Sequence, residues 1–199
     1  MARKLHIGGQ VAAPGWEVFD ANAGPVVDHV GNAADLSRFP DNTFSAIYAS
    51  HVVEHFDYMN HLLATLKEWH RTMTPGGVLY VSVPDLDVLA SLFADRARFS
   101  KQDRFFIMRM IFGGHFDRYD YHIVGLNEEF LVDFLRGAGF TDLRKVEAFG
   151  LFADASGMQF KDVPISVNMT CCKPMPQLTP DAGWSSADIG AQNVERKGR

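Results

Sequence analysis

Hydrophobic residues follow two kinds of pattern along this chain, and together they predict an α/β protein. The apolar runs at 44–49 and 78–83 show no alternation, which is typical of strands covered on both faces. Residues 58–73 and 130–138 instead place apolar residues at helical spacing. In residues 163–172 apolar side chains at the odd positions alternate strictly with mostly polar ones at the even positions, which indicates another strand.

Weaker patterns complete the predicted order of elements. Further strands are expected at 4–8, 16–19 and 143–149, and further helices at 86–99 and near 105–112. The helix near 105–112 carries many apolar residues, so we expect it to be mostly buried or to cover a pocket.

Connections between the predicted strands restrict the topology. Only Val11 to Gly15 separates the first two strands, and Pro14-Gly15 ends any helical run, so the helix usual at this point is missing or reduced to a turn. No helix separates the last two strands, which should therefore pair antiparallel.

Length and composition narrow the class of protein. The chain has 199 residues, of which 47% are apolar, and its formal net charge is −5. These values fit one globular domain, expected at 1–173, followed by a poorly ordered tail at 174–199 without periodicity. The acidic balance argues against a nucleic-acid surface, and no run has the roughly 18 apolar residues of a membrane helix.

The location expected from the sequence is the cytoplasm. The N-terminus runs directly into a strand and shows no apolar signal core. Cys171 and Cys172 are adjacent on a predicted strand and point to opposite faces, so a disulfide between them is not expected. Reduced cysteines are typical of the cytoplasm.

Polar residues gather where the predicted strands end. Gly8, Gly9 and Gln10 follow the first strand, and Asp20 ends the second. Ser50 and His51 follow the strand at 44–49, with Glu54 and His55 just beyond. In an open α/β sheet, ligands bind at the carboxyl ends of the strands, so these positions are the first candidates for a site.

The stretch 35–56, D-L-S-R-F-P-D-N-T-F-S-A-I-Y-A-S-H-V-V-E-H-F, resembles the core of the class I S-adenosylmethionine (SAM) dependent methyltransferases. It is most similar to the small bacterial branch of predicted SAM-dependent methyltransferases, of the type 11 kind. The element G-W-E-V-F-D after a short glycine loop supports this resemblance. The chain departs from the pattern at Ser45, where the branch has Asp, at Val53, where it has Leu, and at Gly8-Gly9-Gln10, where it has G-x-G.

This resemblance implies a fold and a cofactor. The fold is a Rossmann-like, doubly wound and mostly parallel sheet with an antiparallel last strand and an abbreviated first helix. The cofactor is SAM, with Asp20 on the ribose, Asp35 on the adenine amino group and a neighbouring backbone group on the ring edge. The cofactor-binding residues implied are Gly8, Gly9, Gln10, Asp20, Ala21, Asp35, Leu36, Ser50 and His51. Both aspartates also have a purely structural interpretation: Asp20 could start a turn, and Asp35 could cap a helix.

His51 is the candidate general base, because it follows the strand where cofactor and acceptor should meet. The loop F-G-G-H-F-D-R-Y-D-Y-H-I-V-G at 112–125 is polar and aromatic, as ligand sites often are. It resembles an F-G-G…H insertion of the same methyltransferase branch, and we interpret residues 100–126 as a wall or lid over the acceptor. An ordinary surface loop whose tyrosines pack on the core is the alternative. The candidate acceptor-binding residues are His115, Tyr119, Tyr121 and His122. A metal site of His115, Asp117 and His122 fits by ligand type, but such spacing is common by chance, so no metal is predicted.

The function expected is methyl transfer from SAM to a small-molecule or sugar-containing acceptor. The incomplete glycine loop motivates an alternative, a methyltransferase-like domain that has lost catalysis and serves as a binding or regulatory module. A nicotinamide-dependent oxidoreductase fits less well, because G-x-G-x-x-G is missing. The aromatic loop and the tail are two segments through which a homodimer could form.

Overall fold

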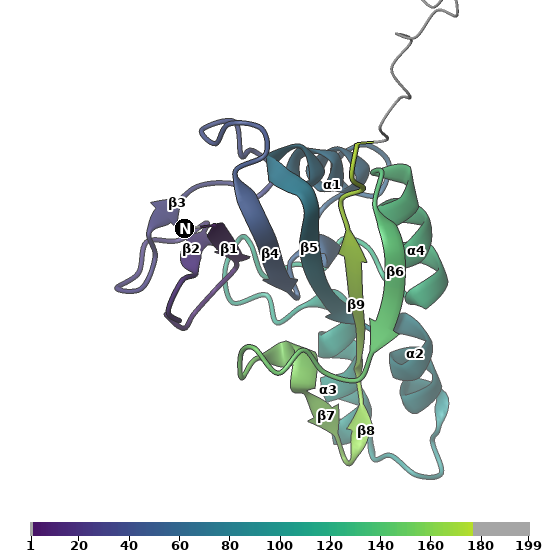
Figure 1. The fold of residues 1–199 in the computed structure, drawn as a ribbon. Helices are drawn as coiled ribbons and strands as arrows, with labels where there is room; N and C mark the ends of the chain where they lie inside the picture. The colour runs from purple at the N-terminus through teal and green to yellow at the C-terminus, as the bar shows by residue number, and fades with distance from the viewer. Residues whose placement is uncertain (1, 177–199) are drawn as a thin grey trace, which may run out of the picture.

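The computed structural model describes residues 2–176, and a seven-stranded sheet in the order β3-β2-β1-β4-β5-β9-β6 runs through it (Figure 1). The strands of this sheet are β1 (Arg3–Ile7), β2 (Glu17–Asp20), β3 (His29–Val30), β4 (Phe44–Ser50), β5 (Met73–Pro84), β6 (Thr141–Val146) and β9 (Ser166–Cys172). β7 (Gln159–Phe160) and β8 (Val163–Pro164) form a separate short hairpin.

Strand directions confirm the predicted topology. β1 pairs in parallel with β2 and β4, β2 pairs in parallel with β3, and β4 pairs in parallel with β5. β9 lies antiparallel between β5 and β6, as expected for two consecutive strands without an intervening helix. No helix occurs between β1 and β2 in this part of the chain, which confirms the abbreviated connection.

The helices begin where the sequence supplies caps. Their bounds are α1 (His61–Thr72), α2 (Leu86–Ala94), α3 (Lys101–Phe112) and α4 (Glu128–Gly137), with single 3₁₀ turns η1 (Val53–His55) and η2 (Ala155–Gly157). The Asp85 carboxylate accepts hydrogen bonds from the first turn of α2, and the Asn127 side chain accepts from Phe130 N–H in α4. Both caps satisfy backbone donors that a helix start leaves free.

One face of the sheet is covered by α1 and α4, which pack on each other and on the central strands (Figure 1). Leu66 and Trp69 from α1 and Leu131 and Leu135 from α4 are fully buried in this core. The Trp69 indole N–H also donates to Ala33 O at 2.8 Å. This tie holds the segment after β3 against α1.

The opposite face carries an aromatic cluster in place of a helix near the centre of the sheet. His6, Trp16, Tyr48 and Phe152 pack mostly edge to face with ring centroids 4.0–6.2 Å apart. Tyr48 is fully buried, and burial lowers the pKa of His6 to about 4, so His6 stays neutral in this cluster. The strand at 44–49 is therefore covered on both faces, as its unbroken apolar run predicts.

A half-buried carboxylate, that of Asp154, fastens the connector between β6 and β9 to this face. The Tyr48 hydroxyl donates to Asp154 Oδ2 at 2.7 Å, and the Ser50 hydroxyl donates to Asp154 Oδ1 at 3.2 Å. The backbone N–H of Ser156 also donates to Asp154 Oδ1, at 2.9 Å. Residues 147–158 are thereby held across the ends of the central strands.

One expectation about local structure is wrong. The helix near 105–112 is not mostly buried: in α3 only Ile107 is buried, while Phe105, Phe106 and Phe112 are exposed. α3 packs on α2 and the β7-β8 hairpin in a small cluster separate from the main core, so its other face meets solvent. Pro75, Gly76 and Gly77 lie in a bulge inside β5, where the pairing with β4 jumps from Met73 to Val78.

Other boundaries shift only slightly. The predicted strand at 163–172 is divided at Ile165 into β8 and β9. Cys171 and Cys172 are both free thiols, as expected. None of the helices between residues 2 and 176 is long and apolar enough to cross a membrane. The predicted tail at 174–199 lies almost entirely outside the described residues.

Replacing Tyr48 with Phe tests the role of the Asp154 carboxylate. Tyr48→Phe removes the shortest hydrogen bond to Asp154 and leaves that oxygen without this donor. We expect a loss of about 1–3 kcal/mol in the free energy of unfolding, measured by chemical denaturation. Tyr80→Phe is the matched control, since the described residues give the neighbouring Tyr80 hydroxyl no side-chain hydrogen bond. Equal losses in both variants would contradict the assignment.

Candidate functional site

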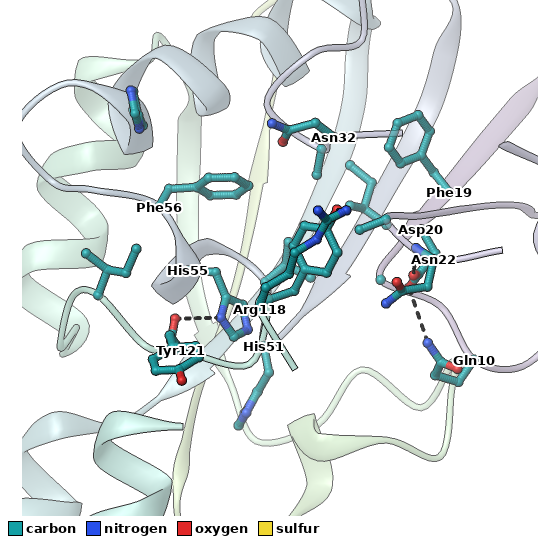
Figure 2. Close-up of a pocket in the computed structure, with 18 residues that line it drawn as sticks. Gln10, Phe19, Asp20, Asn22, Asn32, His51, His55, Phe56, Arg118 and Tyr121 are labelled. Carbon is teal, nitrogen blue, oxygen red and sulfur yellow. Dashed lines mark hydrogen bonds between the residues drawn. The ribbon is translucent and has the colours of Figure 1, made fainter. Parts of the chain in front are cut away.

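A cavity of about 440 Å³ opens where β1, β2 and β4 end (Figure 2). Its lining comes from the loop after β1, the end of β2, the turn after β4 and the loop at 118–123. These segments are far apart in the sequence and meet because parallel neighbouring strands bring their carboxyl ends to one edge of the sheet. The volume falls within the range of small-molecule sites, about 300–1,000 Å³.

Gly8 brings the loop after β1 into contact with the turn after β4. Its φ is +73°, and a Cβ at this position would lie 2.8 Å from Val52 Cγ2. Its N–H donates to Phe19 O at 2.8 Å, which ties the loop to β2. A residue with a side chain would be strained in this backbone conformation and would push Val52 away. Glycine is thus needed for the wall of the cavity to close.

Asp20 presents its carboxylate to the cavity from the end of β2. Oδ1 accepts the N–H of Asn22 at 2.7 Å, which makes Asp20 the start of a turn. Oδ2 accepts from the Gln10 side-chain amide at 3.2 Å, as Figure 2 shows. A carboxylate held in this way retains free lone pairs and can accept further hydrogen bonds from a ligand.

His51 lies at the cavity wall in a left-handed backbone conformation, with φ +54°. Its Nε2 lies 2.9 Å from the Ser166 hydroxyl, which itself donates to Ala155 O at 3.0 Å. Because the hydroxyl has a single proton, His51 Nε2 must be the donor in the first bond, and the lone pair of the ring is on Nδ1. Burial, with the neighbouring His122, lowers the pKa of His51 to about 3, so the ring is neutral at pH 7.

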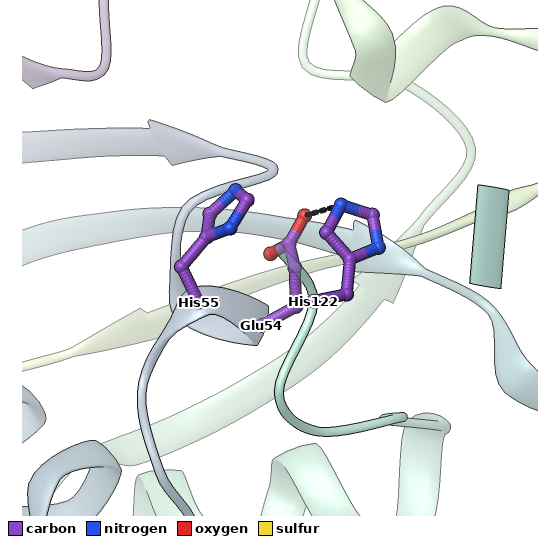
Figure 3. Close-up of side chains that lie close together, drawn as sticks. All are labelled: Glu54, His55 and His122. Carbon is purple, nitrogen blue, oxygen red and sulfur yellow. Dashed lines mark ion pairs between the residues drawn. The ribbon is translucent and has the colours of Figure 1, made fainter. Parts of the chain in front are cut away.

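Glu54, His55 and His122 form a second group beside the cavity (Figure 3). Glu54 is 1% exposed, and neither carboxylate oxygen has a hydrogen-bond partner among the described residues. Burial raises the pKa of Glu54 to about 8. His122 Nε2 lies 3.9 Å from Glu54 Oε1, and the His55 ring lies beside that of His122 with centroids 5.0 Å apart.

The aromatic loop supplies part of the cavity wall. Arg118, Tyr119 and Tyr121 line the cavity, whereas His115 stacks on the Tyr121 ring with centroids 4.0 Å apart. The N–H groups of Ile123 and Val124 both donate to Glu54 O, at 2.8 and 3.2 Å. This pairing fixes the end of the loop against η1 and keeps its residues beside the turn after β4.

The structure brings together some of the residues predicted from the sequence and leaves others apart. Those that line the cavity are Gly8, Gln10, Asp20, Ala21, His51, Tyr119 and Tyr121. Those outside its lining are Gly9, Asp35, Leu36, Ser50, His115 and His122.

Each residue outside the lining has other contacts. Gly9 packs against the His6 ring, and Ser50 binds Asp154. Leu36 is in the core, and Asp35 accepts the N–H of Ser37 at 3.0 Å.

Several lining residues have no strong signal in the sequence. Asn32 and Ala33 follow β3 and line the cavity, although the sequence indicates only that Gly31 and Asn32 interrupt regular secondary structure. His61 and Phe56 lie at or before the start of α1 and also line it. Their proximity depends on how α1 packs, which spacing along the chain does not reveal.

A family model described as "Methyltransferase domain" matches residues 15–81. This match covers β2 to β5 and so includes Asp20 and the turn after β4. The search of curated proteins found no match.

Many solved structures share the fold. A SAM-dependent methyltransferase from Archaeoglobus fulgidus is 18% identical with a TM-score of 0.56, and 86% of each chain is covered. A protein from Bordetella parapertussis described as a possible exported protein is 13% identical with a TM-score of 0.54, over 87% of this chain and 63% of that one. The CurJ carbon methyltransferase is 17% identical with a TM-score of 0.51, over 87% of this chain and 48% of that one. The present chain thus spans less than two thirds of the last two, and identities this low show the fold alone.

Replacing Gly8 with Ala tests the close contact that shapes the cavity. We expect Gly8→Ala to lower the free energy of unfolding by about 2–4 kcal/mol, because a strained backbone and a clash with Val52 act together. Gly15→Ala is the matched control: its φ is +79°, but nothing lies within 4 Å of the added Cβ. It should cost only the backbone strain, about 1–2 kcal/mol. Equal losses in a denaturant titration would show that the contact with Val52 is unimportant.

Proposed function

We propose that this chain is a class I SAM-dependent methyltransferase, which binds SAM in the cavity and transfers its methyl group to an acceptor. One observation carries the proposal: the Asp20 carboxylate lies at the end of β2 and faces a cavity above the ends of β1 and β4. An acidic side chain at this place in a doubly wound fold can accept the two hydroxyls of a ribose.

The cofactor would extend along the strand ends. The ribose would bind at Asp20 and Ala21, and the methionine part would lie along Gly8, Gly9 and Gln10 toward Ser50 and His51. The adenine would lie near Asn32 and Ala33, which line the cavity after β3. Asp35 and Leu36 follow directly, so the adenine edge would meet the backbone at the start of this segment.

Methyl transfer from SAM is an in-line displacement in which the protein supplies mainly alignment. Bound SAM would supply an activated methyl group to a lone pair on the acceptor, and the electron pair of the broken carbon–sulfur bond would stay on sulfur in S-adenosylhomocysteine. The neutral His51 ring, with Nε2–H bound to Ser166, is a weak proton acceptor at pH 7. In this geometry His51 positions the acceptor more readily than it deprotonates it.

The acceptor class that we propose is a small or sugar-containing molecule. Arg118, Tyr119 and Tyr121 supply hydrogen-bond donors and aromatic faces at the cavity wall, a combination that suits polar ring compounds. His115 and His122 would support this wall from behind: His115 stacks on Tyr121, and His122 lies beside His55.

A second candidate function rests on the contact between Gln10 and Asp20. The Gln10 amide occupies one lone pair of the carboxylate on which the ribose would bind. If this contact persists in solution, the chain is a methyltransferase-like binding module that has lost catalysis. Failure of the folded, intact chain to bind SAM in a calorimetric titration would favour this module. Turnover with any acceptor would exclude it.

Calorimetric titration with SAM tests the proposed site. Asp20→Asn keeps the shape of the side chain but removes its charge, so we expect SAM affinity to fall by about 10- to 100-fold. The matched control is Asp133→Asn on the exposed face of α4, away from the cavity, which should leave affinity unchanged. Unchanged affinity in Asp20→Asn would show that the ribose does not bind at this residue.

A further inference from the structure

The Glu54 carboxyl group is the least satisfied polar group near the cavity. It is 1% exposed, and both oxygens lack a hydrogen-bond partner among residues 2–176. A buried carboxyl group in this state is costly unless a ligand completes its coordination. The cavity is adjacent, since His51 and His55 on either side of Glu54 line it.

Two imidazole rings offer lone pairs close to this carboxyl group (Figure 3). His55 Nδ1 lies 3.0 Å from Tyr121 O, and a carbonyl can only accept, so Nδ1 carries the proton and Nε2 the lone pair. His122 Nδ1 is buried and also lacks a partner, while Nε2 lies 3.9 Å from Glu54 Oε1. One ligand atom from each of Glu54, His55 and His122 lies within 4.8 Å of the other two.

The backbone holds these three residues in place. Glu54 and His55 are neighbours in η1, and Glu54 O accepts the N–H groups of Ile123 and Val124, the two residues after His122. The bond from His55 to Tyr121 O is of the kind that orients a metal-binding imidazole from its other nitrogen. Backbone hydrogen bonds thus hold η1, which carries Glu54 and His55, against the loop that carries His122.

We propose that Glu54, His55 and His122 bind a divalent transition-metal ion at the wall of the cavity. Two imidazoles and one carboxylate are the ligand set that suits Zn²⁺, Fe²⁺ or Co²⁺ better than Mg²⁺, which prefers oxygen ligands. Around one such ion the ligand atoms stand about 3.3 Å apart, so from separations within 4.8 Å the side chains need to close by up to about 1.5 Å. The proposal departs from the sequence expectation of no metal and does not depend on SAM binding.

An ion held by three residues keeps positions open for a ligand from the cavity. Because His55 lines the cavity, one of these positions can face an acceptor held there. His51 Nδ1, which carries a lone pair and lies 3.8 Å from Glu54 Oε1, would stand next to the ion as a third nitrogen. A hydroxyl bound to the ion would lose its proton more easily, which would extend the acceptors to alcohols despite the weak base at His51.

Metal titration of the intact chain, prepared without a histidine tag and stripped with chelator, tests the site. We expect one Zn²⁺ to bind per chain by calorimetry, Co²⁺ to bind with a visible absorption that Zn²⁺ abolishes, and Mg²⁺ to bind far more weakly. Glu54→Gln and His122→Gln should each reduce Zn²⁺ affinity by at least about 100-fold. His61→Gln, which changes an exposed histidine lining the same cavity, is the matched control and should bind as the intact chain does.

Two results would overturn the proposal. One is that the intact chain takes up no Zn²⁺ or Co²⁺, in which case Glu54 is an uncharged buried acid without an ion. The other is that both variants, shown by circular dichroism to be folded, bind Zn²⁺ as tightly as the control. Because each measurement is made without SAM, its failure is separate from a failure of the proposed methyl transfer.

Discussion

The contact between Gly8 and Val52 is the constraint on which the cavity depends. At this point the loop after β1 and the turn after β4 approach so closely that a Cβ on Gly8 would lie 2.8 Å from Val52 Cγ2. Parallel pairing of β1 with both β2 and β4 then brings Asp20 and His51 to the same opening. Because no helix lies between β1 and β2, loops alone cover this edge of the sheet. The aromatic cluster around Tyr48 covers the adjacent face.

Features that depend on short stretches of sequence could be predicted. The buried strand at 44–49, the caps at Asp85 and Asn127 and the antiparallel last strand are each encoded by neighbouring residues or by the absence of a helix. The same holds for Asp20, whose place at the end of β2 follows from the strand pattern alone. The candidate site could be located because the sequence indicates where each strand ends.

Features that depend on packing between distant segments could not be predicted. Glu54 and His122 meet only because the loop after α3 pairs with η1, and nothing in the spacing of 54 and 122 indicates this. The aromatic residues of α3 suggested a buried helix, yet α3 packs on α2 outside the main core. The place of His51 after its strand made it the candidate general base, but the burial that lowers its pKa does not follow from the strand pattern.

The most direct test of the account is a crystal structure of the chain with S-adenosylhomocysteine. We predict that the nucleoside lies in the cavity at the ends of β1, β2 and β4, with both ribose hydroxyls on the Asp20 carboxylate and Gln10 displaced from it. A ligand bound on another surface, or a cavity that stays empty at saturating concentration while Gln10 remains on Asp20, would contradict it.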